Sequence, residues 1–173
     1  MKISAQEEYG LRCLLQLARI EKGQSLTIPE VATLEGLSIP YVAKLLAVLR
    51  QAGLIESVRG RTGGYRLACE PEAVNLGSIL LILGEPLFDD PGYCERHKGT
   101  EVDGLCVHKG SCSLRALWHT LEAWMRDALN RITLADLLHS EHSLSDLLRA
   151  RLREAVLEEP VSALIPLTSV DRP

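Results

Sequence analysis

The chain has 173 residues, 46% of them hydrophobic, and a formal net charge of −4 at neutral pH. This length predicts one domain, with or without an extension, and the apolar content is enough for a core. No apolar run approaches the length of a membrane span and the N-terminus lacks the apolar region of a signal peptide, so we expect a cytoplasmic protein. Five cysteines, an odd number in a reducing compartment, disfavour a disulfide framework.

The N-terminal part of the chain predicts two helices that begin with the same signal. Ser4 and Glu7 have the spacing of a capping box, so a first helix starts there and runs to about residue 22. Thr27 and Glu30 repeat that spacing at the start of a brief second helix.

A third helix follows a tight turn that contains Gly36. Ser38 is its expected N-cap, and the helix runs to about residue 52. Its leucines and valines form a buried side, which leaves Tyr41, Lys44 and Arg50 to point outward. Two helices joined by a tight glycine-containing turn predict a helix-turn-helix, whose second helix reads DNA.

A β-hairpin with a cationic tip comes next. Apolar runs at 54–58 and 65–67 flank a glycine-rich tip that includes Arg59, Gly60 and Arg61. Alone, such a turn is most simply a solvated hairpin. After a helix-turn-helix it predicts a wing that contacts phosphates or enters a minor groove.

The charge distribution agrees with a nucleic-acid contact, although the net charge alone argues against one. Between residues 38 and 69 the only acidic residue is Glu56, and the local charge is +4. The five basic residues of this stretch are Lys44, Arg50, Arg59, Arg61 and Arg66. Such segregation predicts a basic footprint on an otherwise acidic protein.

Three of the cysteines lie in one irregular segment, at about residues 86–113. Eleven residues separate Cys94 from Cys106 and five separate Cys106 from Cys112, so zinc-ribbon and ferredoxin motifs do not match. A loop this long usually has a function or an internal staple, and soft thiolates select zinc or iron–sulfur clusters. From the residues alone, a metal or cluster site, a reactive thiol sensor and unliganded cysteines all stay open.

The other two cysteines are not expected to bind a metal. Cys13 is expected to be a thiol buried on the apolar face of the first helix, and Cys69 is given no ligand role.

A long helix with an apolar stripe follows the cysteines. The stripe recurs at three- and four-residue steps, and only one other helix of similar length is expected, so burial against a second copy explains it better than an intramolecular core. It therefore predicts a homodimer, with Trp118 and Trp124 as anchors. The stripe comprises Leu114, Leu117, Trp118, Leu121, Trp124, Met125, Ala128, Leu129 and Ile132.

These elements define a mainly α fold with a small β-hairpin, a winged helix-turn-helix plus a long dimerisation helix. We assign residues 1–70 to the DNA-binding domain and 71–113 to a connecting helix, capped by Asn75, and the cysteine loop. Residues 114–138 are the dimerisation helix. Residues 139–173 are a helical extension and tail, with an amphipathic helix from Ser143 to Glu158.

The chain resembles the IscR/NsrR/RsrR-type winged-helix transcriptional regulators over roughly residues 1 to 138. The matching stretches run through the helix-turn-helix, the wing and the three cysteines. They are Met1-Lys2-Ile3-Ser4, Gly36-Leu37-Ser38-Ile39-Pro40-Tyr41-Val42, Gly53-Leu54-Ile55, Val58-Arg59-Gly60, Gly63-Gly64-Tyr65-Arg66-Leu67-Ala68, Leu76-Gly77-Ser78-Ile79, Gly84-Glu85-Pro86-Leu87 and Thr133-Leu134-Ala135-Asp136-Leu137.

The resemblance implies a homodimeric regulator, which we expect to be a repressor on a palindromic operator of double-stranded DNA. Ser38 and Tyr41 match the DNA-contacting positions of the family, and Lys44 stands where relatives have a polar base-reading residue. With the wing residues Arg59, Gly60 and Arg61, these form the expected DNA-binding set.

The resemblance also implies an iron–sulfur cluster, [2Fe-2S] or [4Fe-4S], that tunes operator binding to redox, nitric oxide or iron–sulfur status. Its ligands would be Cys94, Cys106 and Cys112, with Glu8 of the partner subunit as the fourth ligand and His108 as the alternative. A cluster shared in this way would set the separation of the two recognition helices.

Two other classes of protein compete with this interpretation. One is a thiol redox enzyme that uses a cysteine of the loop as nucleophile, but the chain has no CxxC, phosphate loop or Ser/His/Asp framework, so we expect no enzyme. The other is a winged-helix regulator whose cysteines hold no cluster or bind zinc.

Overall fold

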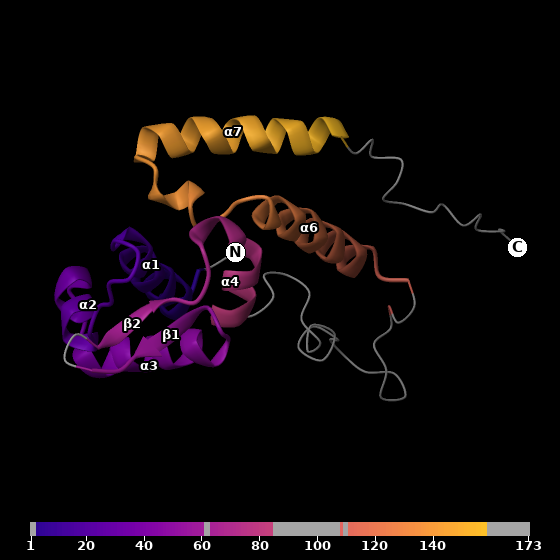
Figure 1. Cartoon of the computed structure of the whole chain (residues 1–173). Coiled ribbons are helices and arrows are strands. Elements are labelled where there is room, and N and C mark those ends of the chain that lie inside the picture. Colours follow the sequence, from indigo (N-terminus) through magenta and orange to yellow (C-terminus); the bar gives the residue numbers. More distant parts are fainter. Residues whose placement is uncertain (1–2, 61–62, 85–107, 109–110, 159–173) are drawn as a thin grey trace, which may run out of the picture. The chain divides into compact units, whose positions relative to one another are not determined.

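The computed structural model describes residues 3–60, 63–84, 108 and 111–158 (Figure 1). These residues form helices and one two-stranded antiparallel sheet, as the sequence predicts. The chain divides into two compact units, 1–138 and 139–173. In the described part no single helix is long and apolar enough to cross a membrane. One bent pair of helices, Ile28–Glu35 and Ile39–Gln51, has that length and composition only when the two are taken together.

Two capping boxes start the first two helices, and both predictions are confirmed. α1 (Ala5–Arg19) begins with reciprocal hydrogen bonds between Ser4 and Glu7, and α2 (Ile28–Glu35) with those between Thr27 and Glu30. α1 ends at Arg19, before the predicted residue 22, because Ile20 is already extended. Gly23, in the turn that follows, has φ +92°.

The turn between α2 and α3 (Ile39–Gln51) has the geometry of a helix-turn-helix. Gly36 caps α2 with φ +65°, a conformation that other residues adopt only at a cost. The two helices meet at a bend of 112°, within the range of this motif. One face of α3 supplies the centre of the core through Val42, Leu45, Leu46 and Leu49.

The hairpin consists of β1 (Ile55–Val58) and β2 (Gly64–Leu67), in the predicted position. Its register pairs Ile55 with Leu67 and Glu56 with Arg66. Tyr65 also exchanges two main-chain hydrogen bonds with Leu26, so the segment before α2 ties the wing to the helices. This contact needs Gly64, because a Cβ there would lie 2.4 Å from the Leu26 carbonyl oxygen.

The connecting helix and the long helix pack against one another. A short 3₁₀ turn, η1 (Pro71–Ala73), leads to α4 (Leu76–Leu83), which Asn75 caps as predicted. α4 contacts α6 (Ser113–Asn130). A Cβ on Gly77 would lie 2.2 Å from the Asn130 Oδ1, so the absent side chain permits the close approach of the two helices.

The assignment of 114–138 to one dimerisation helix is wrong at its C-terminal end. α6 stops at Asn130, Thr133 bridges to Asn75, and η2 (Asp136–Leu138) follows. The side chain of Asp136 accepts hydrogen bonds from the amide and hydroxyl of Thr133 and starts this new turn. Leu134 is fully buried, so the segment after α6 belongs to the core of the first unit.

The second unit contains α7 (Glu141–Glu158). The sequence predicts its start at Ser143, two residues later. The Ser140 hydroxyl accepts a hydrogen bond from the Ser143 amide and so occupies the N-cap position.

Candidate nucleic-acid interface and cysteine site

The outward face of α3 carries the residues expected to read DNA. Ser38 is at the N-cap, but its hydroxyl makes no capping hydrogen bond; its carbonyl instead accepts from the amides of Tyr41 and Val42. Ser38, Lys44 and Arg50 are all exposed. The opposite face of the helix is buried, so these polar groups project from a rigidly packed element.

Tyr41 departs from the prediction that it points outward. It is half-buried, and its ring meets that of Tyr9 edge-on, with centroids 6.0 Å apart and an interplanar angle of 82°. This arrangement is favourable for two aromatic rings. Tyr41 therefore anchors the first turn of α3 against α1 and leaves only part of its surface exposed.

The wing has an exposed arginine at a tightly turned tip. Gly60 has φ +113°, and its carbonyl accepts a hydrogen bond from the Gly63 amide. Arg59 is exposed beside it, whereas Arg61 lies outside the described residues. The tip thus exposes at least one cation, Arg59, that a phosphate could reach.

One of the five basic residues of the footprint is paired within the hairpin. Arg66 faces Glu56 across the hairpin, and its Nε lies 2.7 Å from the carboxylate. Lys44, Arg50 and Arg59 form no ion pair within the part of the chain that the structure describes. Lys44, Arg50 and Arg59 are therefore the described charges available to a polyanion, and the pair of Arg66 with Glu56 is the difference between five cations and a local charge of +4.

Cys112 occupies a position that suits a metal-binding thiolate. It is the N-cap of α6, half-buried, and its Sγ accepts a hydrogen bond of 3.5 Å from the Arg115 amide. Its Sγ is therefore fixed at the start of α6, after the segment that contains the other two predicted ligands. Cys94 and Cys106 lie outside the described residues.

The two candidates for a fourth ligand are both exposed. Glu8 lies in the first turn of α1, and His108 precedes a turn closed by a hydrogen bond from the Ser111 amide to its carbonyl. Among the described residues no three His, Cys, Asp or Glu side chains form a group able to hold a metal ion.

The first turn of α1 is attached to the end of α4, a contact that the sequence analysis missed. The Gln6 side-chain amide donates to the Leu83 carbonyl at 2.7 Å. Glu7 is buried against Gly84, where a Cβ would lie 2.0 Å from its Oε1. Glu8 therefore directly follows two residues that are attached to the end of α4, where the cysteine segment begins. No local sequence pattern predicts this long-range contact.

The apolar stripe of α6 is divided between two environments. Near its C-terminal end Ala128 and Ile132 are buried within the chain. Nearer the N-terminus Leu114, Leu117 and Trp124 are 57%, 46% and 48% exposed. The interpretation as an intramolecular core helix thus accounts for the end of the stripe, and the rest is an apolar face of the kind that dimers bury.

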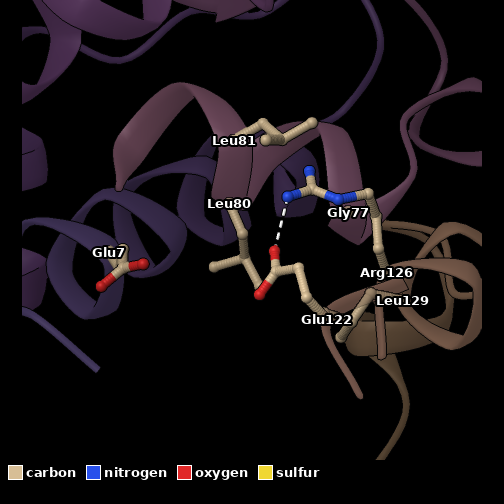
Figure 2. A pocket seen from close by; sticks show the side chains of 7 residues that line it. All are labelled: Glu7, Gly77, Leu80, Leu81, Glu122, Arg126 and Leu129. Carbon is tan, nitrogen blue, oxygen red and sulfur yellow. Dashed lines mark hydrogen bonds and ion pairs between the residues drawn. The ribbon is translucent and has the colours of Figure 1, made fainter. Parts of the chain in front are cut away.

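A small pocket lies where α1, α4 and α6 meet. Figure 2 shows the guanidinium of Arg126 directed at the Glu122 carboxylate, 2.5 Å away, beside Leu80. The pocket has room for about one water molecule, with a cavity volume of about 20 Å³, and is too small for a substrate. Its lining comprises Glu7, Gly77, Leu80, Leu81, Glu122, Arg126 and Leu129.

The other two cysteines differ in environment. Cys13 is fully buried, which confirms the prediction, and burial, with Glu35 nearby, raises its pKa to about 11. Cys69 is exposed after β2. Cys13 is therefore a core thiol that stays protonated.

Comparison with known proteins gives consistent results. A family model described as Rrf2, iron-dependent transcriptional regulator, matches residues 3–140. Protein rrf2 of Nitratidesulfovibrio vulgaris is 35% identical over 138 residues, which cover 80% of this chain and 87% of that protein. The regulator NsrR of Geobacillus kaustophilus is 36% identical over 152 residues, covering 87% and 99%.

Solved structures show the same likeness. T. potens IscR is 32% identical with a TM-score of 0.59, covering 80% of this chain and 86% of that one. CymR, the global cysteine regulator of B. subtilis, is 30% identical with a TM-score of 0.63, covering 80% and 96%. The family match ends at residue 140, just before α7.

Proposed function

Because the chain belongs to the Rrf2 family of iron-dependent transcriptional regulators and is a DNA-binding regulator, we propose that it is a repressor whose operator binding is tuned by an iron–sulfur cluster. The observation that supports the cluster proposal is the placement of Cys112 at the N-cap of α6, where its Sγ is held by the Arg115 amide after the segment with the other two cysteines. The winged helix-turn-helix carries the DNA proposal.

The DNA-contacting residues follow from the exposed face of α3 and from the wing. α3 enters the major groove, with Ser38 and Lys44 facing the bases or backbone and the exposed part of Tyr41 beside them. Arg59, Gly60 and Arg61 of the wing contact phosphates or the minor groove. Residues 1–70 thus form the reading unit.

A homodimer on a palindromic operator accounts for the exposed half of the α6 stripe. Leu114, Leu117 and Trp124 would be covered by the same residues of a second copy, because a two-fold interface uses one patch twice. Two recognition helices related by that axis read two half-sites. The family match ends at residue 140, and the extension 139–173 has no role in this proposal.

The residues proposed to hold the cluster are Cys94, Cys106 and Cys112, whose soft thiolates suit iron–sulfur chemistry. Glu8 of a second copy is the proposed fourth ligand and His108 the alternative. When bound, such a group supplies a redox- and iron-dependent charge next to α1 and α6. The chain itself supplies the fixed first turn of α1, through Gln6 and Glu7, and the capped start of α6.

The test is a set of single Cys→Ser variants purified without oxygen, with iron and acid-labile sulfide counted per chain. Changing Cys94, Cys106 or Cys112 should abolish both, while changing Cys13 or Cys69 should not. The ultraviolet–visible spectrum should show charge-transfer bands that the first three variants lose.

Two further variants identify the fourth ligand. Glu8→Ala should retain some cluster with an altered spectrum, because a carboxylate is the most exchangeable member of such a ligand set. If only His108→Ala has this effect, the fourth ligand is local and the link between subunits is lost. If anaerobic protein contains zinc and no sulfide, the zinc-stapled regulator replaces the cluster proposal. Metal-free and colourless anaerobic protein would favour a cluster-free regulator.

A further inference from the structure

One arginine of α1 contacts the end of α2 through both side chain and main chain. Arg12 Nε lies 2.5 Å from Oε2 of Glu35, and its Nη2 donates to the Glu35 carbonyl at 3.2 Å. Gln16 donates to the other carboxylate oxygen of Glu35 at 2.5 Å. The Glu35 side chain is only 6% exposed, and both of its carboxylate oxygens accept hydrogen bonds from side chains of α1. Glu35 is the last residue of α2, and the left-handed Gly36 follows it directly.

The same arginine reaches the recognition helix through two aromatic rings. The guanidinium lies 5.4 Å from the centroid of the Tyr9 ring, a cation–π distance. Tyr9 in turn meets Tyr41, in the first turn of α3, edge-on. The hydrogen bond and charge of Glu35 raise the pKa of Arg12, which keeps the guanidinium charged. Arg12 thus contacts α2 directly and α3 through one intervening ring.

From these contacts we propose that Arg12 is a positioning residue that fixes the pose of the helix-turn-helix on α1, and through it the register of α3 on DNA. The proposal rests on the proposed contact of α3 with DNA and is independent of any cluster. Its physical basis is that Arg12 contacts the last residue of α2 directly and, through the Tyr9 ring, the first turn of α3. One side chain of α1 thus links the two helices on either side of the Gly36 turn.

A positioning role predicts a different effect on DNA binding from that of an ion pair that only stabilises the fold. Sequence-specific binding needs the side chains of α3 to meet base edges in register, whereas non-specific binding depends on phosphate charge. Loosening the pose should therefore lower specific affinity and leave non-specific affinity unchanged. The salt slope should also stay unchanged, because Arg12 is engaged with Glu35 rather than with a phosphate.

The experiment compares Arg12→Gln and Arg12→Lys with the full-length wild type. The probes are a duplex selected by the wild-type protein from a randomised library and a duplex of unrelated sequence, followed by fluorescence anisotropy over a salt series. Arg12→Gln should lose about tenfold in specific affinity, within the usual range of a coupling between sites. Arg12→Lys should recover only part of this loss, since lysine keeps the charge but cannot bond carboxylate and carbonyl in a fixed fork.

Lys22→Gln is the matched control, because Lys22, in the turn after α1, forms a solvent-exposed ion pair with Glu70. It should bind both duplexes as the wild type does. Should Arg12→Gln not fold, Glu35→Gln tests the same contact with the shape of the side chain preserved, and it should show the same selective loss.

Several results would overturn the proposal. Wild-type specific affinity in Arg12→Gln, or an equal loss on both duplexes, would leave Arg12 without a positioning role. A reduced salt slope in Arg12→Gln would mean that Arg12 contacts a phosphate instead. Full recovery of specific affinity in Arg12→Lys would mean that only the charge of Arg12 matters. If the wild type selects no sequence at all, the proposed function fails too; if it does select one and Arg12→Gln is unchanged, only this inference fails.

Discussion

Replacing Arg59 by alanine tests whether the wing contacts DNA. If Lys44, Arg50 and Arg59 each contact a phosphate in both copies of a dimer, the described residues make about six such contacts, and the salt slope is about −5.4. The variant removes two of them, so the slope should fall in magnitude by about 1.8. Raising the salt concentration fourfold would then weaken wild-type binding about twelvefold more than it weakens the variant. At fixed low salt the operator affinity should fall by about 1–3 kcal/mol if the arginine also reads a groove edge.

The assay is fluorescence anisotropy with a labelled operator duplex between about 50 and 200 mM salt, the range over which such contacts are resolved. The matched control is the double variant Glu56→Gln with Arg66→Gln, which removes a neighbouring wing pair without changing the net charge. Its slope should equal that of the wild type. An unchanged slope in Arg59→Ala, or an equal reduction in the control, would refute the assignment of the tip as the phosphate contact.

Three further outcomes follow from the structure. Leu117→Glu with Trp124→Glu should give a monomer in sedimentation, because both side chains are exposed in the single chain, and a monomeric wild type would contradict the dimer. Gly64→Ala should lower the free energy of unfolding by about 1–3 kcal/mol, since its Cβ would meet the main chain of Leu26; an unchanged denaturant midpoint would argue against that contact. Burial raises the pKa of Cys13 to about 11. The stability that the protonated Cys13 thiol contributes is therefore complete below the pKa of a thiol in the unfolded chain, and it is lost as the pH rises from that value through about 11. Cys13 should accordingly resist alkylation at pH 8 in the native protein, while rapid labelling would show that it is accessible.

Local signals in the sequence predicted most of the elements that bear the DNA-contacting residues. The two capping boxes, the glycine turn at Gly36 and the wing strands act within a few residues of chain, and the structure has all of them where they were expected. The end of α6 was missed because Ile132 continues the helical spacing, although Asn75 pairs with Thr133 and draws the chain into a different contact.

Contacts between distant residues could not be predicted in the same way. The pair of Arg12 and Glu35 joins positions 23 residues apart, and neither belongs to a recognisable local pattern. Glu7 could be predicted as the capping-box partner of Ser4, but its contact with the distant Gly84 could not. The pairing of Glu56 with Arg66 depends on strand register, which places the two residues opposite one another. The convergence of Cys94, Cys106 and Cys112 stays a prediction.

The most direct test of the central claim is the operator affinity of anaerobically purified protein, measured before and after the iron is removed by a chelator. Iron and sulfide are counted in both samples, and sedimentation confirms that both remain folded dimers. A regulator tuned by an iron–sulfur cluster should show two affinities that differ by about 5- to 150-fold, the usual size of coupling between two sites. Equal affinities of the iron-containing and iron-free protein for the same operator would contradict the account.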